Sequence, residues 1–132
     1  MTDLDAALGF YERFFDVRLR GRRKRMAWID LGDQFIALSV ADEVTPDRGR
    51  HVGLVVDDKE ALRAALADAG FDVVPSGSLR VRDQSGNQLE IIDYREVQFS
   101  KTEAVLKGMG MPGLEKSEQG RAEMREKGLL DE

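Results

Sequence analysis

Apolar residues recur at helical spacing in two stretches of the chain. In residues 3–15 and again in residues 58–69, apolar positions follow one another at intervals of three and four. The second stretch is preceded by aspartates and followed by a glycine, which are the residues preferred at helix starts and just past helix ends. The pattern predicts one helix in each stretch, the first capped by Thr2 or Asp3.

Short runs that alternate or are rich in β-branched residues lie between and after these helices. Turn residues such as Gly32-Asp33, Ser76-Gly77 and Ser85-Gly86-Asn87 separate the runs. Residues 42–49 contain a proline and a glycine and are typical of a linker between two halves. We expect strands at residues 17–20, 26–31, 34–40, 51–56, 71–74, 79–82 and 88–94.

An internal repeat relates the two halves. A shift of 54 residues places Asp3 on Asp57, Gly32 on Gly86 and Gln34 on Gln88. Each half then contains a helix, two strands, a turn of glycine, a polar residue and glutamine, and a last strand. The second half alone opens with a strand, whose counterpart would fall before Met1.

This repeat predicts an α+β domain of two βαβββ modules in residues 1–98. Module one spans residues 1–41 and lacks its opening strand, and module two spans residues 50–98. Residues 99–132 form a separate tail. Because the edge left by the missing strand would invite pairing with another chain, we expect a homodimer or a tail that covers the edge.

Composition narrows the class of protein. The chain has 132 residues, a formal net charge of −5 and no cysteine. It is long enough for one domain and has no disulfide, thiolate metal ligand or cysteine nucleophile, as is typical of a cytoplasmic protein. No apolar run approaches the roughly 20 residues that cross a bilayer, and the N-terminus lacks the features of a secretory signal. We expect a cytoplasmic protein without a membrane segment.

One basic block, residues 18–25, stands out against the acidic total. It falls where the pattern predicts a hairpin, so a solvated hairpin is the simplest interpretation. An anion-binding or nucleic-acid-binding patch is the alternative. The net negative charge and the lack of aromatic residues within the block argue against nucleic acid.

Three segments together resemble a known family. They are Ala7–Glu12, His51–Asp58, and the run Arg82–Ile91 with its Asp-x-Ser-Gly-Asn-x-x-Glu turn. Over residues 3–95 the chain resembles the vicinal oxygen chelate superfamily, which includes glyoxalase I, bleomycin-resistance proteins and extradiol ring-cleaving dioxygenases. The resemblance implies paired βαβββ modules whose curved sheets enclose a cleft, commonly in a homodimer.

The resemblance also implies where a metal would bind. Metal-using members place a histidine on the first strand and a glutamate on the last strand of each module, and His51 and Glu90 match these positions in module two. In module one the 54-residue shift puts Ile36 at the glutamate position, and the histidine position does not exist. Two ligands hold a divalent ion weakly. We therefore expect a residual half-site without a functional metal; any cofactor is unknown.

Aromatic residues provide candidates for contact with a flat ligand, namely Trp28, Phe35, Tyr94 and Phe99, although each also suits a core. Glu90 is a candidate proton acceptor, or else the partner of an arginine. We expect a small, partly apolar or planar molecule to bind between the modules. The expected binding residues are Trp28, Ile36, His51, Glu90 and Tyr94.

Two alternatives remain open at this point. The first is a metal-dependent, glyoxalase-like lyase or isomerase, or a ring-cleaving dioxygenase, which uses His51 and Glu90. The second is a structural or regulatory domain that binds a partner through the tail. The tail contains a capping-box pattern at Ser100–Glu103, a break at residues 108–113 and a second predicted helix at 114–127, interrupted by Gly120. Such a helix must dock to be stable, which would bury Met109, Met111 and Leu114.

Overall fold

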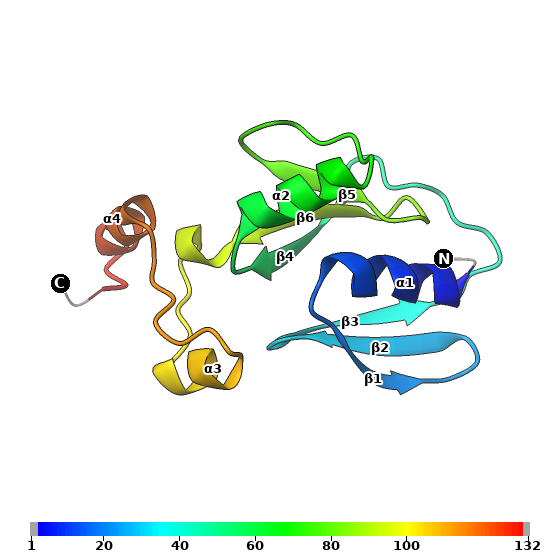
Figure 1. The fold of residues 1–132 in the computed structure, drawn as a ribbon, viewed down its shortest axis with the longest axis horizontal. Coiled ribbons are helices and arrows are strands. Elements are labelled where there is room, and N and C mark those ends of the chain that lie inside the picture. Colours follow the sequence, from blue (N-terminus) through cyan, green and yellow to red (C-terminus); the bar gives the residue numbers. More distant parts are fainter. Residues whose placement is uncertain (1–2, 131–132) are drawn as a thin grey trace.

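The computed structural model describes residues 3–130 and contains two three-stranded sheets, helices that cover them, and a helical tail (Figure 1). The elements in chain order are α1 (Leu4–Phe14), β1 (Arg18–Arg22), β2 (Met26–Leu31), β3 (Gln34–Ser39), β4 (Val52–Val56), α2 (Lys59–Asp68), β5 (Leu79–Arg82), β6 (Gln88–Asp93), η1 (Tyr94–Glu96), α3 (Glu103–Gly108) and α4 (Glu118–Glu126).

The first sheet is antiparallel and has the order β1-β2-β3. A two-residue turn joins β2 to β3, and Gly32 in this turn has a φ of 62°, which a residue with a side chain rarely adopts. The second sheet has the order β4-β6-β5, with β4 parallel and β5 antiparallel to β6. The outer edges of β3 and β4 therefore have no strand neighbour within residues 3–130.

Both main helices begin at the aspartates that the sequence favoured. The Asp3 carboxylate accepts a hydrogen bond from the Ala6 N–H (3.1 Å), and the Asp58 carboxylate accepts one from the Ala61 N–H (3.0 Å). These bonds satisfy backbone donors that a helix start leaves without a partner. Both predicted helices are confirmed; Thr2, the other candidate cap, lies outside the described residues.

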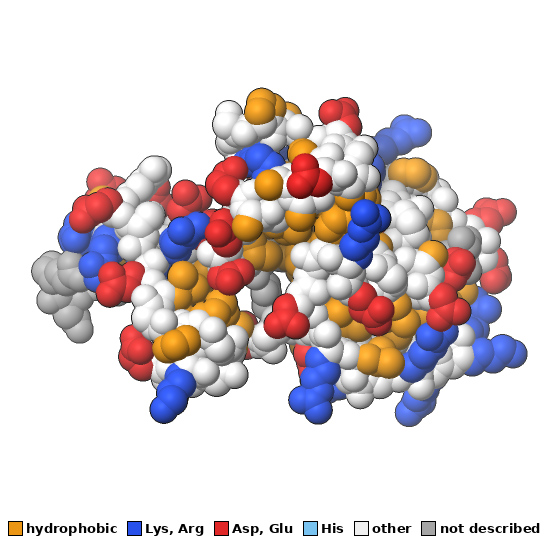
Figure 2. All heavy atoms as spheres, in the orientation of Figure 1, with side chains coloured by type: hydrophobic (Ala, Val, Ile, Leu, Met, Phe, Trp, Pro, Cys, Tyr) orange, Lys and Arg blue, Asp and Glu red, His pale blue; other side chains and the backbone are white. Residues whose placement is uncertain are grey.

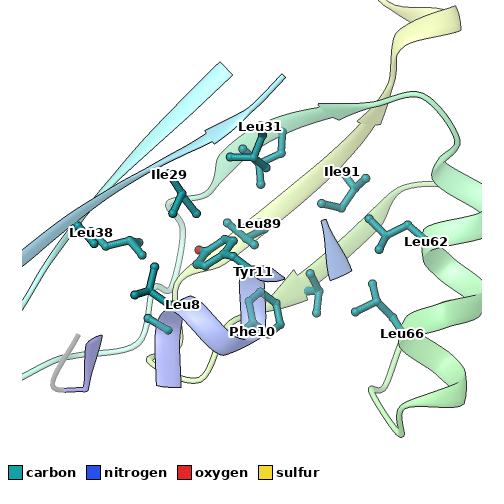
Figure 3. Close-up of a cluster of buried hydrophobic side chains, with 14 of the residues drawn as sticks. Leu8, Phe10, Tyr11, Ile29, Leu31, Leu38, Leu62, Leu66, Leu89 and Ile91 are labelled. Atoms are coloured by element: carbon teal, nitrogen blue, oxygen red, sulfur yellow. The ribbon is translucent and has the colours of Figure 1, made fainter. Parts of the chain in front are cut away.

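One hydrophobic core is shared by both helices and both sheets (Figure 3). Leu8 and Tyr11 of α1 pack there with Leu62 and Leu66 of α2. Each sheet contributes alternate residues, because successive side chains of a strand point to opposite faces. The core-facing strand residues are Ala27, Ile29, Leu31, Leu38, Leu54, Leu79, Val81, Leu89 and Ile91. The opposite side of both sheets, turned away from the two helices, is called the open face below.

The turn between β5 and β6 is hydrogen-bonded to α1. Asp83 accepts hydrogen bonds from the N–H groups of Ser85 and Asn87 (both 2.9 Å) and from the Asn87 amide (2.8 Å). The Tyr11 hydroxyl of α1 donates to the same carboxylate at 3.1 Å. Burial, together with the Asp83 charge, raises the pKa of Tyr11 above its usual value. The Asp-x-Ser-Gly-Asn motif therefore stabilises a turn and its contact with α1.

The predicted strand at residues 71–74 was wrong. These residues form an extended loop, although Phe71 and Val73 still pack against the core. The buried guanidinium of Arg63 donates to the carbonyl oxygens of Val74 (2.6 Å) and Gly77. A side chain thus satisfies the backbone oxygens that a sheet ladder would otherwise pair.

The tail docks on its own chain, but its helices start later than expected. Thr102 caps α3, and Ser117 caps α4, so the predicted start at residue 114 was wrong. Gly120 lies inside α4 and lets this helix approach η1 closely, because a Cβ atom there would lie 2.4 Å from the Arg95 carbonyl oxygen. Leu106 and Met124 are buried, whereas the residues expected to be buried, Met109, Met111 and Leu114, are half-buried.

Candidate functional site

His51 and Glu90 meet on the open face of the second sheet. Glu90 of β6 lies beside Gly53 of β4 in the parallel ladder, and His51 precedes Gly53 by two positions on the same side. The His51 Nε2 lies 2.8 Å from the Glu90 Oε2. The side chains are 35% and 27% exposed, so both groups are accessible to a small molecule.

A pocket of about 500 Å³ lies beside Glu90, between the end of β6 and α4. Ile92, two residues after Glu90, supplies an apolar surface on the same side of β6. Gly53 leaves room for it, since a Cβ atom there would lie 3.1 Å from the Ile92 Cδ1. The pocket combines the Glu90 and Asp93 carboxylates of β6 with polar groups from the tail. Its lining residues are Lys59, Gly77, Ser78, Glu90, Ile91, Ile92, Asp93, Glu96, Gln119, Gly120 and Glu123.

Asp93 secures the far end of β6. Its carboxylate accepts hydrogen bonds from the Arg95 guanidinium (2.8 and 2.9 Å) and from the N–H groups of Arg95 (3.0 Å) and Lys59 (3.1 Å). Burial acts to raise the pKa of Asp93, but these hydrogen bonds and the Arg95 charge outweigh it and hold the pKa below its usual value. Asp93 is therefore a structural anchor between β6 and the start of α2.

His51 and Glu90 are side chains of the types that hold divalent metals. Within residues 3–130 no group of three or more histidine, cysteine, aspartate or glutamate side chains converges. Stable metal sites in proteins use three or more protein ligands, so this pair alone provides too few.

The 54-residue repeat matched Ile36 to Glu90. The structure places these two side chains on different faces of their sheets. Ile36 packs against the core, as do Leu89 and Ile91 on either side of Glu90. Ala37, between Ile36 and Leu38, instead points to the open face and pairs with Trp28. Ile36 therefore faces the core, whereas its neighbours Phe35 and Ala37 lie on the open face, as Glu90 does in the second sheet.

Trp28 lies on the open face of the first sheet, because its neighbours Ala27 and Ile29 are both buried on the core side. It is half-buried, whereas Phe35 on β3 is 64% exposed. Neither aromatic ring belongs to the pocket beside Glu90. The structure thus places the expected binding residues on two sheets, separated by the gap between β3 and β4.

Tyr94 takes part in docking the tail. It is buried, and its hydroxyl accepts a hydrogen bond from the Lys101 N–H (2.8 Å). The Lys116 ammonium lies 3.5 Å from the centre of the Tyr94 ring and donates to the carbonyl oxygens of Tyr94 and Phe99 (both 2.6 Å). Burial, followed by repulsion from Lys101, lowers the pKa of Lys116 to about 8. Sequence reasoning missed Lys116, because only the folded tail brings it to these rings.

A larger cavity of about 930 Å³ is lined by the end of α1, the turn between β2 and β3, the end of β4, α2 and the tail. Phe14 and Phe15 at the end of α1 and Val55 and Val56 of β4 contribute apolar wall, and the tail residues from Gly108 to Met111 close one side. Five aspartates and three basic side chains also line it. The charged lining residues are Asp16, Asp30, Asp33, Asp57, Asp58, Arg13, Arg18 and Lys101.

The basic block forms an exposed hairpin of β1 and β2. Figure 2 shows its lysine and arginine side chains at the lower right, beside carboxylates. Arg22 pairs with Asp5 (2.7 Å) and Arg25 with Asp42 (3.3 Å). Pairing of this kind disperses the positive charge, as expected of a solvated hairpin. Within residues 3–130 no helix has the length and apolar character needed to cross a membrane.

No protein-family profile matches this sequence, and no curated protein matches it. Solved structures do match its fold. A possible glyoxalase from Bacillus cereus superposes with a TM-score of 0.61 at 24% identity, covering 69% of this chain and 89% of that one. The chain has the vicinal oxygen chelate fold.

Two other proteins of this fold match to a similar extent. A fosfomycin resistance protein from Listeria monocytogenes has a TM-score of 0.60 at 13% identity and covers 70% of this chain and 85% of its own. The bleomycin resistance determinant encoded on transposon Tn5 has a TM-score of 0.57 at 19% identity, with coverage of 69% and 88%. Because nearly the full length of each neighbour is matched, the vicinal oxygen chelate fold expected from the sequence is confirmed.

Proposed function

We propose that this protein binds a small, partly apolar or planar molecule on its open face, without a complete metal site. One observation carries the proposal: the accessible Glu90 carboxylate, positioned by His51 at 2.8 Å, borders a pocket of about 500 Å³ beside the apolar Ile92. Small-molecule sites commonly combine apolar walls with a few oriented polar groups. The neighbours named for resistance to bleomycin and fosfomycin support a role in which a small molecule is bound.

In this proposal Glu90 is the hydrogen-bond acceptor for the ligand. His51 limits the freedom of the carboxylate, so that binding orders fewer side chains. Trp28 offers an aromatic surface on the first sheet for a ligand that extends across the open face.

Thermal denaturation tests the proposal. A panel of size-matched aromatic amines and aromatic acids is screened for ligands that raise the melting temperature, and each hit is repeated with Glu90→Gln. Loss of the shift in Glu90→Gln supports the proposal, with Glu118→Gln, an exposed glutamate in the first turn of α4, as the matched control. A shift that is unchanged in Glu90→Gln, or no hit in the panel, contradicts it.

A metal-dependent lyase, isomerase or dioxygenase is the alternative function. The contact between His51 and Glu90 favours it, because these are the residue types that hold catalytic metals. Elemental analysis after purification without chelators distinguishes the two functions. A stoichiometric divalent metal that is lost in His51→Ala would replace the binding function with a metal-dependent one.

We also propose that the protein forms a homodimer in the cytoplasm. Exposed apolar side chains at Leu19, Phe35 and Val52, each at least 48% accessible, support self-association. Light scattering at micromolar concentration measures the mass directly, and a monomer across the concentration range would contradict the homodimer.

A further inference from the structure

The larger cavity of the protein, of about 930 Å³, has no part in the function proposed above. It shares no lining residue with the pocket beside Glu90. Its volume lies in the range of small-molecule sites, which is about 300–1,000 Å³. The two sites can therefore be tested separately.

The tail forms one wall of this cavity and makes two contacts with the turn between β2 and β3. The Lys101 ammonium pairs with the Asp33 carboxylate, and the Lys101 side chain is only 8% exposed. The Met109 methyl group lies against Gly32, in the space that a Cβ atom at this position would need. All four residues line the cavity, so the folded tail encloses it on this side.

Apolar side chains from several parts of the fold line the cavity. Phe14 and Phe15 contribute aromatic rings from the end of α1, and β4 and α2 supply aliphatic side chains. Met109 and Met111 contribute thioethers from the tail, and both are half-buried. Methionine side chains adapt in shape and make favourable contacts with aromatic rings. These walls favour an apolar, aromatic ligand.

The charges that line the cavity balance one another. Three of the five aspartates are already paired: Asp33 with Lys101, Asp30 with Arg20 (3.8 Å) and Asp58 with Arg95 (3.8 Å). The other charged lining residues are two aspartates and two arginines, all of them exposed: Asp16, Asp57, Arg13 and Arg18. Without an excess of either sign, the lining favours an uncharged ligand, because an ion would lose hydration and gain no net opposite charge.

The Tyr94 hydroxyl supplies one polar group to the cavity lining. Tyr94 is buried, and its hydroxyl oxygen accepts a hydrogen bond from the Lys101 N–H (2.8 Å). Among the described residues, no group accepts a hydrogen bond from the hydroxyl proton. A buried donor without an acceptor costs free energy, so a ligand oxygen that accepts this proton would be stabilised here.

We propose that this cavity binds an uncharged, apolar aromatic molecule whose carbonyl oxygen accepts a hydrogen bond from the Tyr94 hydroxyl. The tail closes the site with Met109 and Met111. The proposal does not depend on the function of the pocket beside Glu90.

The experiment uses propionyl-dimethylaminonaphthalene, an uncharged aromatic ketone whose fluorescence emission moves to shorter wavelength in apolar surroundings. Titrated with the whole protein, it should show a saturable blue shift with one probe bound per chain. Glu90→Gln should bind the probe with wild-type affinity. Absence of saturable binding overturns the proposal, and so does loss of binding in Glu90→Gln, which would place the probe in the other pocket.

A cavity-filling variant locates the probe. Ala65 lines the cavity from an exposed position of α2, so Ala65→Phe should lower the affinity about tenfold or more. Ala64→Phe is the matched control, because Ala64 is also exposed on α2 and does not line the cavity. If Ala65→Phe does not melt cooperatively, Ala61→Phe takes its place, since Ala61 is an exposed lining residue too. Wild-type affinity in the cavity-filling variant overturns the proposal.

Tyr94→Phe tests the hydrogen bond to the ligand. Because this change also removes the acceptor of the Lys101 N–H, the ketone is compared with its propyl analogue, in which a methylene group replaces the carbonyl. The analogue is measured by displacement of the ketone. The ketone should bind about three- to tenfold more weakly to Tyr94→Phe than to the wild type, whereas the analogue should bind equally to both. An equal loss for both ligands, or no loss for the ketone, overturns the proposal.

Discussion

Two glycines in helices should respond in opposite ways to the same substitution. In the interior of a helix, alanine is more favourable than glycine by about 1 kcal/mol. Gly9 of α1 is exposed and has no atom within 4 Å of an added Cβ, so Gly9→Ala should stabilise the protein by about that amount.

Gly120 of α4 differs because its added Cβ would lie 2.4 Å from the Arg95 carbonyl oxygen and 3.2 Å from the Ser117 Oγ. Overpacking of this kind costs about 1–3 kcal/mol, which exceeds the gain in helix propensity. A nine-residue helix is not stable alone. The clash should therefore be relieved by movement of α4 away from η1, with the two sheets left folded.

Hydrogen exchange measured by mass spectrometry follows this movement. In Gly120→Ala the amides of residues 118–126 should exchange about five- to thirtyfold faster, which corresponds to a net cost of about 1–2 kcal/mol for tail docking. Amides of β6 should keep their protection. Gly9→Ala should raise the melting temperature and leave the tail unchanged. If both variants raise the melting temperature and α4 keeps its protection, the close approach of α4 to Arg95 is refuted.

Three further changes test the anchors of the fold. Asp93 stabilises the fold above about pH 4, and this stabilisation is lost as the pH falls, because its pKa is lower in the folded protein than in the unfolded chain. In Asp93→Asn the free energy of unfolding should therefore depend less on pH in the acid range. Tyr11→Phe should lower the free energy of unfolding in urea by about 1–2 kcal/mol, because it removes the hydrogen bond to Asp83. The wild type should also lose stability above about pH 10, since the Tyr11 pKa is raised in the folded state, and this loss should be smaller in Tyr11→Phe. Leu66→Ala should cost about 2–5 kcal/mol through a core cavity, whereas Leu129→Ala, at 51% exposure, should change stability by less than about 0.5 kcal/mol.

The sequence alone determined the elements whose signals are local. Helix periodicity and the aspartate caps placed α1 and α2, since a cap depends on residues within one turn of the helix start. Alternation placed β2, β3 and β6, and the turn motif before β6 pointed to the fold that the solved structures confirm. The resemblance to the vicinal oxygen chelate superfamily also identified His51 and Glu90 as a pair.

Only the tertiary structure decided which face each residue occupies and which long-range partners meet. A displacement of one residue turns every side chain of a strand to the other face, so the 54-residue shift matched Ile36 to Glu90 although Ile36 faces the core and Glu90 faces away from it. The predicted strand at residues 71–74 is a loop instead. Its carbonyl oxygens accept hydrogen bonds from Arg63, which lies more than ten residues away in the sequence. Local patterns carry no information on such contacts, because they form between segments that only packing brings together.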